Sequence, residues 1–277
     1  MTNDTIGLST FSITHMLKQV TATRFVKKMS NGRTIPCVFE CEDEVGNSFE
    51  IVVKFSECLH EKETSLAHEA ISAILAADLN LPIPEPFIVK FDNEFISIIS
   101  DAAIKSFMER SCRLGFGLKL VTGYSVWQKG KKISANMTQE AAHIIIFDQI
   151  IINSDRRPDN PNCQYLSDDF LIYDHELAFT RALFWKAPWE DGGMNDLSDR
   201  NKHIFAGPYF TVKPRDLNSF VETWNRIPKS RFVEYKNALP DEWKKDNLKI
   251  EEILNYLSSS QDNIQVIVDN AIKVLTS

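Results

Sequence analysis

The sequence predicts an α+β fold of two lobes, an antiparallel β-rich amino-terminal lobe over residues 1–122 and a mainly helical carboxy-terminal lobe over 123–277. One observation behind this prediction is the strand-like pattern of residues 24–55 around two turn signals. Another is the helical spacing of apolar side chains over 138–153 and again from residue 214 to the end. The length of 277 residues suits one large domain or two small ones.

The composition is that of an ordinary globular protein. With 43% hydrophobic and 25% charged residues, the chain fits neither a disordered nor a fibrous class. A net charge of -7 and a pI near 5.5 give no general attraction to nucleic acid or anionic lipid. The first ten residues lack signal-peptide features, and Asp148 and Gln149 interrupt the most apolar stretch. We therefore expect a cytoplasmic protein that binds neither nucleic acid nor a membrane.

The five cysteines form no paired framework, which fits a reducing compartment. Cys37 and Cys41 have the types of a metal pair, but in an extended strand four residues span roughly 13 Å, too far for one ion. We interpret both as strand residues.

The first β-rich segment is expected to form a three-stranded antiparallel meander. The runs "RFVKKM" and "TIPCVFEC" flank Asn31 and Gly32, a pair that favours a hairpin because both central positions of that turn take positive φ. Residues 44–47 indicate a second turn before "SFEIVVKF". Lys54 is then placed near the end of the third strand.

One main helix is expected in this lobe, over residues 65–79, where apolar side chains recur at helical spacing. The three prolines of "NLPIPEP" end it. "FISIIS" (95–100) and "GFGLKLV" (115–121) are expected to be strands on either side of a short helix over 102–110. The sheet is therefore expected to be mostly antiparallel.

In the second lobe, "TQEAAHIIIFDQIIIN" is apolar nearly all round and should form a buried helix with Thr138 as its N-cap. The polar stretch "NSDRRPDNPN" (153–162) follows directly, and "FLIY" after it has the pattern of a strand. Four further helical patterns run to the end: "RDLNSFVETWNRI", "SRFVEYKNAL", "KIEEILNYLSS" and "NIQVIVDNAIKVL".

The polar stretch contains the residue types of a phosphoryl-transfer site. Asp155 and Asn160 are five positions apart, and Asp174 follows at the end of "FLIY". Phosphoryl transfer needs one carboxylate near the attacking hydroxyl, with an amide and a second carboxylate on a divalent cation. Lys54 and Glu69 would complete such a site.

These motifs resemble those of the HipA-like kinases, in particular the compact HipA-like kinase domains, and more distantly the phosphoinositide and protein kinases. The resemblance covers most of the chain, in the segments "FVKKMSNGRTIPCVF", "VVKF", "LAHEAISAILAADLNLPIPEP", "FDQIIINSDRRPDNPN" and "IYDHELAF". The aspartate loop with the downstream Asp-His is its specific part. It implies a two-lobed protein-kinase-like fold with ATP and Mg²⁺ in the cleft between the lobes.

The resemblance also implies a role for each candidate residue. Asp155 would orient or deprotonate the acceptor hydroxyl, while Asn160 and Asp174 would hold Mg²⁺ on the ATP phosphates. Lys54 would contact the α- and β-phosphates, steadied by Glu69. Two segments would complete the ATP site, a loop over the phosphates and a hinge at adenine: Ser30, Asn31, Gly32, Arg33 and Thr34 in the first, Leu120 and Val121 in the second.

One position departs from the family pattern. Relatives usually have Asp-Arg-His where this chain has Asp155, Arg156 and Arg157, so the role of that histidine is not carried over. Arg157 could instead neutralise charge on the transferred phosphoryl group.

Each candidate also has a structural interpretation. The Asp155 loop alone could be a polar connection whose Asp and Asn side chains bond to the backbone, and Lys54 alone could be a solvated strand lysine. Their joint order along the chain favours a site. Glu69 lies on a helix of Ala, Ile and Leu, where an unpaired carboxylate is costly, so it needs a cation or several hydrogen-bond donors. Lys54 is the obvious candidate.

Two familiar motifs are excluded by single residues. His68 and Glu69 resemble the start of a zinc-protease helix, but the second histidine of that motif would fall at Ser72. "GFGLKL" resembles a dinucleotide-binding loop, but Leu120 replaces its third glycine and no helix opens there.

Other polar residues are expected to support the site. Asp148, inside the apolar helix, should brace the loop that follows it. His175 and Glu176 flank Asp174 and are expected to be structural or to support the metal ligand. By the resemblance, residues 180–208 would lie where related kinases receive substrate, although their tryptophans could instead fill the core.

The resemblance implies a kinase that transfers the γ-phosphoryl group to a hydroxyl, foremost that of a protein serine or threonine. Two alternatives stay open: a small-molecule or lipid kinase, and a catalytically silent nucleotide-binding module that binds a partner. The acidic charge balance does not favour a lipid kinase. Because HipA relatives are often regulated by a DNA-binding antitoxin, the resemblance implies an antitoxin-like regulator as a further partner.

Overall fold

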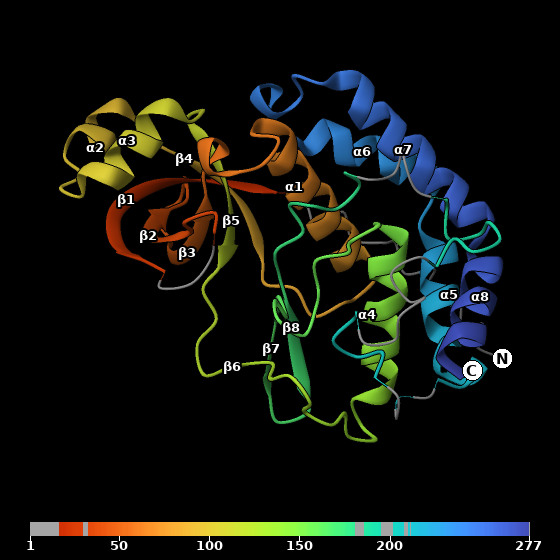
Figure 1. The fold of residues 1–277 in the computed structure, drawn as a ribbon. Helices are drawn as coiled ribbons and strands as arrows, with labels where there is room; N and C mark the ends of the chain where they lie inside the picture. Colours follow the sequence, from red (N-terminus) through yellow and green to blue (C-terminus); the bar gives the residue numbers. More distant parts are fainter. Residues whose placement is uncertain are drawn as a thin grey trace, which may run out of the picture.

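The computed structural model describes residues 17–29, 33–180, 186–194, 202–207, 210 and 212–276. Figure 1 shows the strands of the first lobe on one side and the long helices of the second lobe on the other. The predicted α+β class, β-rich first and helical second, is therefore confirmed. The predicted hairpin residues Ser30, Asn31 and Gly32 lie outside the described residues.

Five strands close a barrel in the order β1-β2-β3-β5-β4. Their bounds are β1 (Lys18–Lys28), β2 (Cys37–Glu42), β3 (Ser48–Lys54), β4 (Pro86–Lys90) and β5 (Leu114–Lys119). All neighbouring pairs are antiparallel except β1 and β4, which are parallel. The predicted meander of the first three strands is confirmed, although β1 begins earlier than residue 24. Lys54 ends β3, as expected.

The first turn is longer than a two-residue hairpin, because the N–H of Met29 donates to the carbonyl of Pro36 at 2.9 Å and β2 starts only at Cys37. The second turn matches the prediction, since the N–H of Asp43 donates to the carbonyl of Asn47 at 3.0 Å. Cys37 and Cys41 are buried in β2, in agreement with their interpretation as strand residues.

The barrel has its own apolar core, and the glycines of β5 lie against it. A Cβ at Gly117 would lie 2.9 Å from a methyl group of Val89 and would also clash with Ile51. The glycines of "GFG" therefore allow the barrel side chains to pack closely against β5. The absence of a dinucleotide-binding loop at this position agrees with the sequence analysis.

We expect Gly117→Ala to destabilise the protein by about 1–3 kcal/mol, because an added methyl group must displace packed side chains. Equilibrium urea unfolding measures this change. The control is Gly207→Ala, since a Cβ there would meet no atom of the described residues within 4 Å. Equal stability of the two variants would contradict the packing interpretation.

Helix α1 (Glu63–Asp78) lies between the barrel and the second lobe (Figure 1). Its side chains are buried on almost every side, and the larger of the two cores runs from α1 through the second lobe. The Asp78 carboxylate accepts hydrogen bonds from Arg231, at 2.8 and 3.1 Å, and from the Tyr235 hydroxyl, at 2.8 Å. These contacts fix α1, and with it Glu69, against the helices of the second lobe.

The predicted strand over "FISIIS" is wrong, because its first half lies in helix α2 (Asn93–Ser97) and its second half forms no strand. Ile96 and Ile99 are buried in the barrel core whereas Ile98 is exposed, which is the spacing of a helix turn with one apolar face. In a strand, Ile96 and Ile99 would point to opposite faces, and both faces would have to be buried. The short helix predicted over 102–110 is confirmed as α3 (Ala102–Arg110), capped by the Asp101 carboxylate.

The described part of the second lobe contains five α-helices and a small sheet in the order β6-β7-β8. Their bounds are α4 (Thr138–Ile150), α5 (Asn218–Arg226), α6 (Lys229–Ala238), α7 (Asn247–Asp262), α8 (Ile264–Thr276), β6 (Ser125–Val126), β7 (Cys163–Leu166) and β8 (Asp169–Ile172). Three short 3₁₀ segments are η1 (Ser56–Cys58), η2 (Pro214–Asp216) and η3 (Asp241–Trp243). Helix α4 is the predicted buried helix, with α5 and α8 beside it (Figure 1).

Thr138 is not the N-cap of α4. Met137 occupies that position, and the Thr138 hydroxyl donates to the carbonyl of Ser134 at 3.1 Å. The Ser134 hydroxyl accepts from the N–H of Met137 at 3.3 Å, so the preceding turn supplies the polar contact. Among the described residues, no helix combines the length and apolar character needed to cross a bilayer.

Candidate active site

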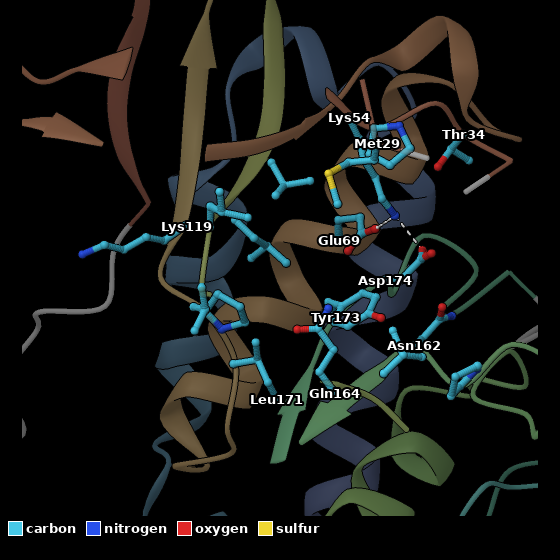
Figure 2. Close-up of a pocket in the computed structure, with 18 of the residues that line it drawn as sticks. Met29, Thr34, Lys54, Glu69, Lys119, Asn162, Gln164, Leu171, Tyr173 and Asp174 are labelled. Carbon is cyan, nitrogen blue, oxygen red and sulfur yellow. Dashed lines mark hydrogen bonds and ion pairs between the residues drawn. The ribbon is translucent and has the colours of Figure 1, made fainter. Parts of the chain in front are cut away.

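A cavity of about 570 Å³ lies between the barrel and the second lobe. Its walls come from both lobes, and Figure 2 shows Lys54, Glu69 and Asp174 grouped at one end of it. The lining includes the apolar side chains Val52, Phe116, Leu118 and Leu171 and the polar side chains Lys54, Glu69, Asn160, Asn162 and Asp174. The cavity thus combines an apolar region with a charged end.

Lys54 joins the two lobes through ion pairs. Its ammonium bonds to Glu69 Oε1 and, at 2.5 Å, to Asp174 Oδ1, and it lies 3.7 Å from Glu176 Oε2. The Lys54 side chain is only 12% exposed. Burial opposes its charge, but Asp174, Glu69 and Glu176 raise the pKa of Lys54 above its ordinary value. Lys54 therefore stays charged.

Glu69 is held in place by both of its oxygens. Oε1 accepts from Lys54, and Oε2 accepts from the backbone N–H of His175 at 3.0 Å. The expected pairing of Glu69 with Lys54 is confirmed. Burial raises the pKa of Glu69, with Lys54 opposing the shift. Since α1 is packed against the second lobe, Glu69 fixes Lys54 relative to the residues after β8.

Asp155 lies beside two amides of its own loop. Asn160 Nδ2 donates to Asp155 Oδ2 at 2.8 Å, and Asn162 Nδ2 donates to the same oxygen at 3.2 Å. The turn is closed by reciprocal backbone bonds of 3.0 and 2.9 Å between Arg157 and Asn160. Burial and the nearby Asp174 raise the pKa of Asp155, with Arg157 opposing the shift. The loop therefore holds its carboxylate in a defined position.

A buried network of ion pairs and hydrogen bonds connects this loop to helix α4. Arg156 donates to Asp148 Oδ2 at 2.6 Å and Oδ1 at 3.2 Å, and also to the carbonyl of Asn162. Asp148 accepts in addition from Asn153 Nδ2 at 2.8 Å and contacts His203 Nε2 at 3.0 Å. The expectation that Asp148 braces the following loop is confirmed.

Asp174 follows β8 with a positive φ of 64°, a conformation that non-glycine residues seldom adopt. Burial opposes ionisation of Asp174, but Lys54 lowers the pKa of its carboxyl group. Glu176 lies two residues on and is buried, whereas the Asp174 side chain is 25% exposed. Burial and the carboxylates of Asp174 and Glu69 raise the pKa of Glu176 to about 7, with Lys54 opposing.

The remaining candidates lie around the cavity. Thr34, Leu120 and Val121 line it, and Arg33 Nη2 is 3.9 Å from Glu176 Oε1. The N–H of Leu120 already donates to the carbonyl of Glu50 at 2.7 Å, so it is used within the sheet. Ser30, Asn31 and Gly32 lie outside the described residues. Asp155 is not among the lining residues, although it is bonded to Asn160, which is.

Sequence reasoning did not single out the supporting roles of Asn162, Arg156 and His203. Asn162 lies in the polar loop and could have been found as a second amide beside Asp155. Arg156 is next to the candidate base, but a charged residue in a polar loop gives no sign of being buried. His203 is distant in the sequence, and only the fold brings it to Asp148.

A lysine ending the third barrel strand, its glutamate partner on the next helix, and an Asp-Asn loop facing an aspartate at a strand end define a kinase-like fold. The chain belongs to the HipA-like kinase family, whose family model matches residues 22–271. The predicted family is confirmed.

Solved structures that match the chain include those of two kinases. One is the proinflammatory kinase CtkA of Helicobacter pylori, with a TM-score of 0.51, 13% identity, and coverage of 94% of this chain and 97% of that one. At this identity the likeness shows a shared fold. The MAP kinase LmaMPK10 from Leishmania major is a weaker match, with a TM-score of 0.28, 13% identity, and coverage of 91% and 81%. The comparison with curated proteins gave no match.

Proposed function

We propose that the chain is an ATP- and Mg²⁺-dependent kinase that transfers the γ-phosphoryl group to a hydroxyl of a protein serine or threonine. The observation that carries this proposal is the ion-paired Lys54 at the charged end of the cavity, bonded to both Glu69 and Asp174. We also propose residues 1–122 and 123–277 as the two lobes that enclose the nucleotide.

The donor set of the site fits Mg²⁺. Asp174 offers a carboxylate, and Asn160 uses its Nδ2 on Asp155, which leaves the amide oxygen as its ligand atom. Magnesium prefers such oxygen ligands and keeps several waters or phosphate oxygens besides. Asp174 and Asn160 would hold the ion, which when bound neutralises charge on the phosphates.

The residues of the chain then divide the work of binding and orientation. Lys54 binds the α- and β-phosphates as a fixed positive charge, and Glu69 keeps its ammonium in place. The apolar walls at Val52, Leu118 and Leu171 suit an adenine ring. Asp155 orients the acceptor hydroxyl and takes up its proton as the hydroxyl attacks.

The position of Asp155 supports a macromolecular acceptor. Its side chain is 19% exposed, and that of the neighbouring Arg157 is 48% exposed, so solvent reaches this loop. A small acceptor would need an enclosing pocket to hold it at the carboxylate. A serine or threonine on another protein surface can instead be presented to Asp155 by contacts spread over a larger area.

The proposal is tested by following transfer of labelled phosphate from γ-labelled ATP, with and without Mg²⁺, to the chain itself and to proteins of a cell lysate. We expect Mg²⁺-dependent ADP formation and labelled Ser or Thr after acid hydrolysis of the products. Binding of ATP with no turnover for any acceptor would favour the silent nucleotide-binding module. Label found only on small molecules or lipids would favour the other alternative.

We expect Lys54→Ala to raise the apparent KM for ATP at least about tenfold, because a charge-assisted contact to phosphate contributes roughly 1.5–3 kcal/mol. Initial rates at varied ATP concentration measure this effect. Lys27→Ala, at an exposed position of β1, is the matched control. Unchanged KM in Lys54→Ala would count against the proposed nucleotide geometry.

A further inference from the structure

Glu176 is a buried carboxylate whose partners are too distant for a hydrogen bond. The residue is 4% exposed, and no described residue hydrogen-bonds its Oε2. Lys54 Nζ lies 3.7 Å from Oε2, and Arg33 Nη2 lies 3.9 Å from Oε1. Both distances exceed the usual hydrogen-bond range. A buried carboxyl oxygen without a hydrogen-bond donor is a position where a bound cation would supply the missing partner.

Three carboxylates meet at this point. Oxygens of Glu69, Asp174 and Glu176 all lie within 4.8 Å of one another. Opposite ligands of one Mg²⁺ ion are about 4.2 Å apart, twice the metal–oxygen distance, so small side-chain rotations would bring two of them onto a shared ion. A single buried ammonium, that of Lys54, faces all three carboxylates.

The hydrogen bonds decide which carboxylates are free to bind a cation. Both oxygens of Glu69 are engaged, by Lys54 and by the N–H of His175. Asp174 uses Oδ1 on Lys54, and none of the described residues donates to its Oδ2. Glu176 Oε2 is likewise without a donor among the described residues. Asp174 and Glu176 are therefore the pair with ligand atoms to spare.

We propose that Glu176 adds a second carboxylate to the metal site, so that one divalent cation binds Asp174 and Glu176 together before any nucleotide arrives. This inference rests on the proposed function, because it assigns a further ligand to that same site. Glu69 keeps Lys54 while the cation takes the open oxygens. Two carboxylates give the free chain an affinity for divalent cations that Asp174 alone would not provide.

The test is a titration of the full chain with Mn²⁺ alone, followed by the loss of the free Mn²⁺ signal in electron paramagnetic resonance. We expect one site whose Kd rises about tenfold or more in Glu176→Gln, since even outer contacts of a metal site contribute 10–100-fold. Glu252→Gln, an exposed glutamate of α7, is the matched control and should bind as the wild type does.

A second variant guards against a folding defect. Glu176→Asp keeps the charge but withdraws the carboxylate by one methylene group, and it should weaken Mn²⁺ binding while its thermal unfolding stays close to that of the wild type. Wild-type Mn²⁺ affinity in both Glu176 variants would overturn the inference. Failure of the wild type to bind Mn²⁺ without nucleotide at millimolar concentration would overturn it as well.

The outcomes separate this inference from the proposed function. Phosphoryl transfer by the wild type, together with Mn²⁺ binding that does not depend on Glu176, would support the proposed kinase activity and show that Glu176 is not a metal ligand. Glu176-dependent Mn²⁺ binding without transfer to any acceptor would support the metal site and contradict the proposed kinase activity.

Discussion

Asp155→Ala is expected to lower the rate of phosphoryl transfer by about 10²–10⁴-fold, the usual contribution of a positioned general base. The carboxylate is held by Asn160 and Asn162, and its pKa is raised by burial and by Asp174. Because the proposal assigns Asp155 to the acceptor hydroxyl and Lys54 to the phosphates, the loss should fall mainly on kcat and less on the apparent KM for ATP. Initial rates at saturating ATP, compared with KM, separate these two effects.

Asp169→Ala is the matched control for this prediction. Asp169 is an exposed aspartate at the start of β8 and is not among the residues that line the cavity. Its removal should leave the rate within about twofold of wild type, since exposed surface charges contribute little. Equal rates for Asp155→Ala and the wild type would remove Asp155 from the mechanism.

Asp148→Ala is expected to destabilise the protein by about 3–5 kcal/mol, because it leaves the guanidinium of Arg156 buried without its counter-ion. Both side chains are fully buried. Asp148 also accepts a hydrogen bond from Asn153 and contacts His203. Burial opposes the charge of Asp148, but Arg156 and His203 lower the pKa of its carboxyl group. Equilibrium urea unfolding measures the loss of stability.

The control for this prediction is an exposed ion pair. Lys229 and Asp262 lie 2.7 Å apart on the surface, and Asp262→Ala should change stability by no more than about 1 kcal/mol. If Asp148→Ala cost no more than Asp262→Ala, the buried network could not be what holds the Asp155 loop.

Most helices could be predicted from the sequence because their apolar spacing extends over several turns. Strands β4 and β7 could not be predicted from the sequence, since each is short and follows a proline-containing stretch. The strands that pair with β4 are far from it in residue number, since β1 ends at residue 28 and β5 begins at residue 114. The strand expected at "FISIIS" failed for a related reason, because a short apolar run fits a helical turn as well as a strand.

The candidate site was more predictable than the contacts that support it. Lys54, Glu69 and Asp174 have residue types and an order that indicate a kinase site, and folding brings all three together. The burial of Arg156 and its bond to Asp148 depend on how α4 packs, which local patterns do not specify. The third carboxylate, Glu176, becomes informative only once its distance from Lys54 is known.

The central claim, that the cavity binds a metal–nucleotide complex between Lys54 and the Asp155 loop, is tested most directly by a crystal structure with Mn²⁺ and a non-hydrolysable ATP analogue. The account predicts phosphates against Lys54 and an anomalous Mn²⁺ peak bonded to oxygens of Asp174 and Asn160. A nucleotide bound on another surface, or an ion that neither residue contacts, would contradict it.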